Sequence, residues 1–153
     1  MLRQLSRGFA LTEMLVAAAL LAVGLLGQLA LLVTGLQAER DAANMATAAT
    51  LAADLGERIR SNPSAASFYA LDPAATGPPA TDCGLSAPFD AATRAACDIE
   101  EWRREAVTAL AAPEVQVDTK AIGTTATLCA ITIRWEGHGP YGREFTLQLQ
   151  VPK

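Results

Sequence analysis

The first third of the chain contains a long apolar run that begins close to the N-terminus. Residues 14–36 are 23 consecutive positions without a charge. As an α-helix this run is about 34 Å long, enough to cross the roughly 30 Å hydrocarbon core of a bilayer. Arg3 and Arg7 precede the run, so the positive-inside rule predicts a cytoplasmic N-terminus and a head on the opposite, periplasmic side.

A helical pattern with one apolar face continues beyond this run. Apolar residues recur at a spacing of three and four at Met45, Ala48, Ala52, Leu55 and Ile59, which predicts a face that packs on a globular head. Asp54 and Arg58 lie four residues apart and are expected to pair on the outside of the helix. We expect one helix over residues 9–60, ending before Asn62-Pro63, because proline disfavours helix in the residue before it.

The rest of the chain predicts a small mixed domain. Residues 62–92 are rich in proline and glycine and have no regular period. A second helix ends by Pro113, with one apolar face made of Ile99, Trp102, Ala106 and Leu110. A short strand is predicted at 115–117, followed by an antiparallel hairpin of alternating strands at 127–135 and 145–151. A long helix laid on a small antiparallel sheet is an α+β fold.

Composition and charge narrow the function classes. A chain of 153 residues leaves room for one small domain beyond the helix. The net charge is −4, without a basic cluster in the head, so no specific nucleic-acid surface is expected. His138, the only histidine, lies in a turn sequence, and no metal or cofactor site is predicted. No paired acids, nucleophile–base pair or phosphate loop suggests an enzyme, and Trp102 and Trp135 are interpreted as core residues.

Glu13 is a single carboxylate at the start of the apolar run. An unpaired carboxylate costs about 2.5 kcal/mol or more in hydrocarbon, so Glu13 is a candidate functional residue. Residues 1–8 are basic, and they are too short and too polar for a secretory signal. A cleavage site after this leader would leave the apolar run in the mature protein. A plain membrane anchor is the simplest alternative.

The segment Gly8-Phe9-Ala10-Leu11-Thr12-Glu13 resembles the class III signal of type IV pilins and type II secretion pseudopilins. The resemblance implies that prepilin peptidase cuts between Gly8 and Phe9 and methylates the new amino group of Phe9. It also implies that Glu13, the fifth mature residue, pairs with the N-terminal amine of a neighbouring subunit. The implied organisation is a leader at 1–8, a transmembrane and assembly half-helix at 9–36, an amphipathic half-helix at 37–62, and a periplasmic head at 63–153.

Three further segments resemble the type IV pilus modification protein PilV family, namely Leu55–Pro63, Cys97–Trp102 and Ala130–Trp135. Residues 64–92 match no part of that family, and its usual Leu-Pro-Gly-Gly after the second helix is absent. The resemblance implies a pilin-like fold and a minor pilin held in inner-membrane lipid before assembly. It also implies partnership with other minor pilins and the major pilin, and effects on adhesion, twitching motility or DNA uptake.

Two alternatives stay open at this point. A type II secretion minor pseudopilin has the same N-terminal signal and the same kind of head. A membrane-tethered module that binds a ligand through its head requires a basic or aromatic surface patch. The partner pilins, the position in the fibre and any adhesion ligand are not identified by the sequence.

Three cysteines, Cys83, Cys97 and Cys129, are expected outside the inner membrane, where disulfides persist. Cys129 shares a strand face with Ile131 and Ile133, whereas Cys97 lies off the apolar face of the second helix. We therefore expect a Cys83–Cys129 disulfide, contributing about 4 kcal/mol by loop entropy. A Cys97–Cys129 bond is the alternative. No Cys-x-x-Cys redox motif is present.

Overall fold

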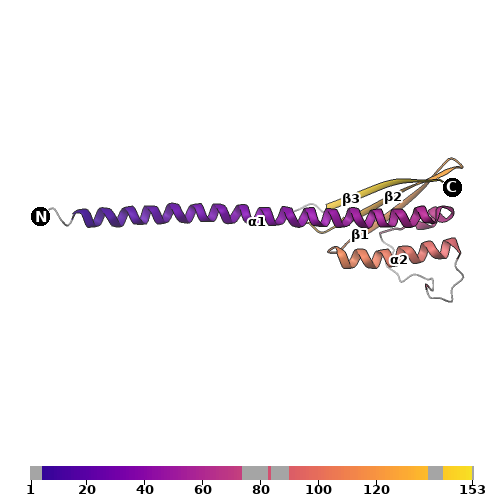
Figure 1. Ribbon diagram of the computed structural model, residues 1–153, viewed down its shortest axis with the longest axis horizontal. Helices are drawn as coiled ribbons and strands as arrows, with labels where there is room; N and C mark the ends of the chain where they lie inside the picture. The colour runs from indigo at the N-terminus through magenta and orange to yellow at the C-terminus, as the bar shows by residue number, and fades with distance from the viewer. Residues whose placement is uncertain (1–4, 74–82, 84–89, 138–142, 153) are drawn as a thin grey trace. The chain divides into compact units, whose positions relative to one another are not determined.

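The structure, a computed structural model, describes residues 5–73, 83, 90–137 and 143–152, the side chains of 5–10 excepted. Its elements in chain order are α1 (Leu5–Ser61), the 3₁₀-helix η1 (Pro63–Tyr69), α2 (Ala91–Ala109), β1 (Glu114–Ile122), β2 (Ala126–Trp135) and β3 (Arg143–Pro152) (Figure 1). The chain divides into two units, residues 1–40 and 41–153. The fold is the expected α+β, pilin-like combination of a long N-terminal helix and a small antiparallel sheet.

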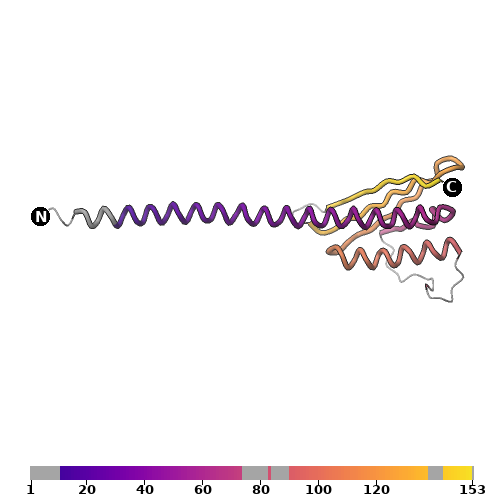
Figure 2. Tube along the Cα trace, in the orientation of Figure 1, coloured from indigo at the N-terminus to yellow at the C-terminus, as the bar shows by residue number. Residues whose placement is uncertain are grey.

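The first unit contains the N-terminal part of α1, which Figure 2 shows in colour from residue 11 onward. The helix begins at Leu5, inside the predicted leader rather than at residue 9. All side chains at residues 11–40 are exposed within this chain. The Thr34 hydroxyl donates to the Ala30 carbonyl at 2.7 Å, so this polar group is satisfied inside the helix. Among the described helices, α1 is long and apolar enough to cross a membrane.

Within the second unit, the last turns of α1 bury the face that the spacing predicts. Met45 is the exception, with 40% of its surface exposed, so the buried face begins one turn later than expected. The four remaining predicted positions are fully buried: Ala48, Ala52, Leu55 and Ile59. Gly56 faces β3, where an added Cβ would lie 3.6 Å from the side chains of Leu147 and Leu149. The small residue therefore sits at a close approach of helix and strand.

The sheet has the order β1-β2-β3, and both pairings are antiparallel. The central strand β2 buries its predicted inner face, which consists of Cys129, Ile131, Ile133 and Trp135. β1 is nine residues long, so the prediction of a short strand at 115–117 was wrong in length. Its second half contains Asp118, Thr119 and Lys120, and pairing with β2 extends it beyond its apolar positions.

α2 and η1 complete the head: α2 runs alongside the last turns of α1 (Figure 1), and η1 contacts both α2 and the sheet. Trp102 and Ala106 of α2 and Leu110, the residue that caps its C-terminus, are buried as predicted, while Ile99 is half-buried. Asp90 caps this helix by accepting a hydrogen bond from the backbone N–H of Thr93 at 2.7 Å. The bond to Thr93 lowers the pKa of the Asp90 carboxyl. η1 lies in a segment that the sequence predicts only as loop.

Candidate functional site

The carboxylate of Glu13 lies on the exposed surface of α1 among apolar neighbours. Val16, Ala17 and Leu20 line the shallow depression next to it, together with Thr12. Within the described part of the chain, no hydrogen bond or ion pair engages this carboxylate. The next charged residue toward the C-terminus is Glu39. Over residues 11–38, α1 therefore presents one carboxylate, an acceptor for a cation, among side chains without charge.

Gly8 and Phe9 lie in the first turns of α1, where the backbone is helical and the side chains are outside the described part. Phe9 is four residues before Glu13. Positions four apart share one face of a helix, so the backbone of Phe9 and the Glu13 position lie on the same side of α1. The structure thus places the predicted cleavage position and the predicted assembly residue one turn apart.

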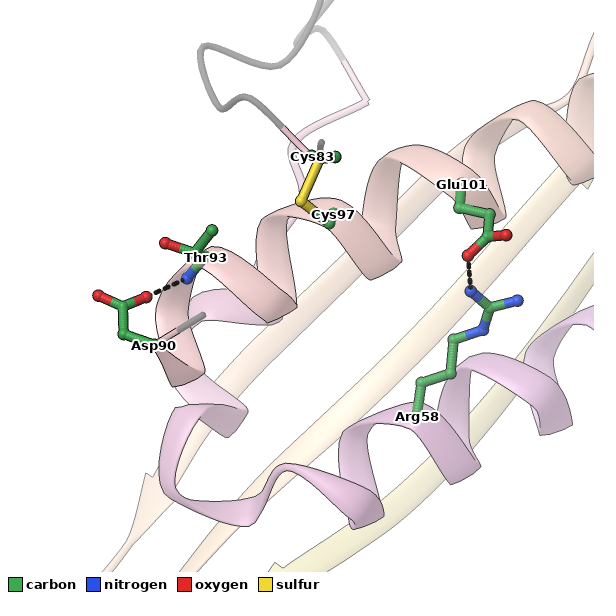
Figure 3. The surroundings of a disulfide bond; sticks show 6 residues. All are labelled: Arg58, Cys83, Asp90, Thr93, Cys97 and Glu101. Carbon is green, nitrogen blue, oxygen red and sulfur yellow. Dashed lines mark hydrogen bonds and ion pairs between the residues drawn. A yellow bond between two sulfur atoms is a disulfide. The ribbon is translucent and has the colours of Figure 1, made fainter. Parts of the chain in front are cut away.

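At the other end of α1, Arg58 joins two helices through three carboxylates. Its guanidinium lies 2.8 Å from Asp54, 2.9 Å from Glu101 and 3.1 Å from Glu105; Figure 3 shows the Glu101 contact. Partial burial lowers the pKa of Arg58, but the hydrogen bonds to Glu101 and Asp54 outweigh burial and raise it. The predicted Asp54–Arg58 pair is confirmed, whereas the two α2 partners were not predicted from the sequence.

A second set of hydrogen bonds links the end of α1, η1 and α2 through Asn62, Tyr69 and Asp98. The Asn62 amide donates to the Ala91 carbonyl at 2.7 Å, so the end of α1 is tied to the start of α2. The Tyr69 hydroxyl donates to the Asp98 carboxylate at 2.6 Å. Burial and this hydrogen bond raise the pKa of Tyr69 to about 12.

The two tryptophans are core residues, as predicted. Trp102 is completely buried, and its indole N–H donates to the Leu51 carbonyl of α1 at 2.8 Å. Trp135 is 3% exposed, and within the described part its indole nitrogen has no hydrogen-bond partner. Trp102, Asp98, Arg58 and Asn62 come from two of the segments named in the sequence analysis, Leu55–Pro63 and Cys97–Trp102. Their contacts form one network that holds α1, η1 and α2 together.

The disulfide joins Cys83 to Cys97, with the Cα atoms 5.6 Å apart (Figure 3). The predicted Cys83–Cys129 bond is therefore wrong, as is the alternative Cys97–Cys129. Cys129 is a free thiol at 0% exposure on the inner face of β2, and burial raises its pKa. Cys97 does lie off the fully buried face of α2, and this position makes it accessible to the exposed Cys83.

Groups of three or more His, Cys, Asp or Glu side chains suited to a metal ion do not occur within the described residues. His138, interpreted from the sequence as a turn residue, lies outside them.

Two protein families match this chain. Residues 30–100 match the family described as Type IV pilin Tt1218, and residues 3–27 match the prokaryotic N-terminal methylation motif. Comparisons with curated proteins and with solved structures gave no significant match. The chain thus carries a type IV pilin domain behind a prepilin methylation motif.

These matches define a class of protein. This class is that of the pilins, which are structural components of pili rather than enzymes. The motif implies processing by a peptidase and assembly with other pilins, and together with the apolar helix it fits membrane anchoring.

Proposed function

We propose that this chain is a PilV-like minor type IV pilin, which primes assembly of the pilus or is built into it. The observation that carries the proposal is the isolated Glu13 carboxylate on an exposed, uncharged helix, four residues after Phe9. A chain that only anchors a head has no use for a carboxylate that opposes membrane insertion.

The proposed chemistry begins with removal of residues 1–8. Prepilin peptidase cuts after Gly8 and methylates the amine of Phe9, which keeps its positive charge. In the fibre, that amine lies beside Glu13 of a neighbouring subunit. Opposite charges within a few ångströms attract strongly in an apolar helix bundle, where an unpaired charge is costly. The pair therefore fixes the axial register between subunits.

Before assembly, inner-membrane lipid surrounds the apolar run and the head lies in the periplasm. Arg3 and Arg7 on the N-terminal side favour this orientation. The Cys83–Cys97 disulfide agrees with it, because disulfides form and persist in the oxidising periplasm.

The finer assignment to a PilV-like minor pilin is supported by the residues that carry that resemblance. Arg58 and Asn62 at the end of α1 bind α2, and Asp98 and Trp102 in α2 bind η1 and α1. Each of these four side chains therefore has a contact that explains its place in the motif. Other minor pilins and the major pilin are the proposed partners.

The experiment is mass spectrometry of filaments sheared from the native cells, with the membrane fraction analysed beside them. We expect an N-methylated peptide that begins at Phe9, present in the filaments at far lower amounts than the major pilin. A Gly8→Leu variant, in which the cleavage site is blocked, provides the unprocessed reference peptide.

Two other results would narrow or contradict the proposal. A processed peptide confined to the membrane fraction would exclude incorporation into the fibre and would favour a secretion pseudopilin or a primer that stays at the base of the pilus. An unprocessed Met1 start in the wild type would indicate a simple anchored domain.

A further inference from the structure

The two edge strands of the sheet differ in how far their free sides are covered. β1 and β3 flank β2, so each has one long side that β2 does not use (Figure 1). An unpaired strand edge presents backbone N–H and C=O groups that can pair with another strand. On β1, Leu71 already occupies part of this side by exchanging backbone hydrogen bonds with Val117, at 2.9 and 3.0 Å.

Charged side chains also protect β1 along its length. Glu114, Asp118 and Lys120 are all exposed. Charges distributed along an edge strand oppose the addition of a further strand. β1 therefore has the features of an edge that does not accept a further strand.

The middle of β3 lacks both kinds of protection. Its charges are confined to its beginning, where Arg143 binds Asp41 and Glu144 binds Arg134, each at 2.6 Å. The following segment, Phe145–Val151, contains neither a charge nor a proline. Within the described residues, only β2 makes backbone hydrogen bonds to β3.

Side-chain burial along Phe145–Val151 indicates which pattern of side chains a strand needs in order to pair with this edge. Phe145 and Leu147 lie on the core side of the sheet but are only half-buried, although Leu149 is 4% exposed. The alternate residues Thr146 and Gln148 are exposed on the other face. A fitting strand alternates in the same way, so that its apolar residues cover Phe145 and Leu147.

We propose that Phe145–Val151 is a docking edge for an extended, alternating apolar and polar strand of a different pilin subunit. The inference rests on the proposed function, because assembly through α1 brings the heads of neighbouring subunits side by side. It adds a second contact, made by the head.

The geometry disfavours a second copy of this chain as the occupant. An antiparallel β3–β3 pair would reverse the direction of one α1 relative to the other, although both chains start in the same membrane. A parallel β3–β3 pair would place the inner face of one sheet beside the outer face of the other, which leaves Phe145 and Leu147 uncovered. The remaining candidate, β1 of the second copy, is charged and already bridged by Leu71.

Photocrosslinking in native cells tests the edge directly. A photoreactive phenylalanine analogue replaces Gln148 in the full chain or, as the control, Asp118. Both positions belong to the same row across the sheet, paired through Ala130, but they lie on opposite edges. We expect at least fivefold more adduct from position 148, with a different pilin identified in it by mass spectrometry. Equal adducts at both positions, or an adduct of the chain with itself, would overturn the proposal.

A charge test uses two matched double variants of the full chain. Thr146→Lys with Gln148→Lys places two lysines on β3, and Gln116→Lys with Asp118→Lys places two in the same rows on β1. We expect the β3 variant to lower incorporation into sheared filaments tenfold or more, and the β1 variant less than twofold. Formation of the Cys83–Cys97 disulfide and resistance to protease report that both variants fold.

The two proposals fail in different ways. If the wild-type chain keeps an unprocessed Met1 start, the proposed function fails. If the wild type is incorporated and the folded β3 lysine variant is incorporated equally well, only the docking edge is wrong.

Discussion

At the scale of single residues, Tyr69 shows how one hydroxyl connects distant parts of the chain. It lies in a short 3₁₀-helix, is completely buried, and donates a hydrogen bond to the carboxylate of Asp98 in α2. Asn62 binds the first turn of the same helix, α2, from the end of α1. A buried polar group without such a partner would cost about 1–3 kcal/mol. The Tyr69–Asp98 hydrogen bond therefore favours one arrangement of η1 and α2.

We predict that Tyr69 titrates about two pH units above an ordinary tyrosine. The folded chain keeps the proton up to about pH 12, whereas the unfolded chain loses it near pH 10. The stability that this bond contributes is complete below about pH 10 and is lost as the pH rises toward 12. Phenolate absorbance of the full chain in detergent follows the titration. Tyr69→Phe should remove the high-pH step, and a step that persists in this variant would contradict the assignment.

At the scale of elements, α2 is connected to its surroundings on two sides. Arg58 and Leu51 of α1 bind it on one side. On another side Cys97 joins it to Cys83, which closes a loop across a sequence separation of 14. Closing a loop of this size removes conformational freedom from the unfolded chain and contributes about 3 kcal/mol. By contrast, exposed ion pairs are worth about 0–1 kcal/mol each.

We predict that the disulfide-linked peptides are those of Cys83 and Cys97. Trypsin separates the three cysteines into peptides 61–94, 95–103 and 121–134, so digestion without reduction identifies the bond directly. Reduction or Cys97→Ser should lower the free energy of unfolding by about 3 kcal/mol. Recovery of the 121–134 peptide in a cross-link would show that Cys129 takes part and would contradict the structure.

At the scale of the whole molecule, the two units have different surface chemistry. Residues 11–40 expose apolar side chains, with Leu31 at 75% and Met14 at 76% exposure. The head buries a closed core beneath charged and polar surfaces. Water-exposed apolar surface of that extent requires lipid or other helices around it. The N-terminal unit therefore determines the surroundings of the chain, and the head determines its specific contacts.

We predict that Glu13→Ala lowers incorporation into filaments by at least tenfold without preventing cleavage after Gly8. Removing one partner of a buried ion pair costs about 3–5 kcal/mol, because the other charge is left unpaired. Quantitative immunoblots of sheared filaments and of the membrane fraction measure the effect. Glu39→Ala, which removes a carboxylate outside the apolar run, is the control and should change incorporation less than twofold. Normal incorporation of Glu13→Ala would exclude the pairing role.

Local patterns in the sequence predicted much of the fold, because they reflect burial along one element. The 3-4 spacing identified Leu55 and Ile59 of α1, and strict alternation identified Ile131 and Ile133 of β2. Both patterns require only that one face of a regular element meets the core. The pairing of Asp54 with Arg58 followed from helix geometry in the same way.

Features that depend on contacts between distant elements were missed or wrong. Glu101 and Glu105 reach Arg58 only because α2 packs beside α1. The predicted Cys83–Cys129 disulfide is wrong because Cys129 lies on the buried strand face that it shares with Ile131. This burial separates Cys129 from the exposed Cys83. The length of β1 depends on its pairing with β2 rather than on its own polar residues. The assembly role of Glu13 stays a prediction from the sequence, where it is a lone charge at the start of an apolar run.

The state of the three cysteines has a practical consequence for microscopy. Cys83 and Cys97 are joined, and Cys129 is completely buried, so the oxidised, folded chain offers no thiol to a maleimide dye. A single cysteine introduced at an exposed position of β1 such as Lys120, away from the proposed docking edge, would then be the only labelled site, with all native cysteines retained. Fluorescent subunits made in this way could be followed in living cells as they leave the membrane and enter a fibre.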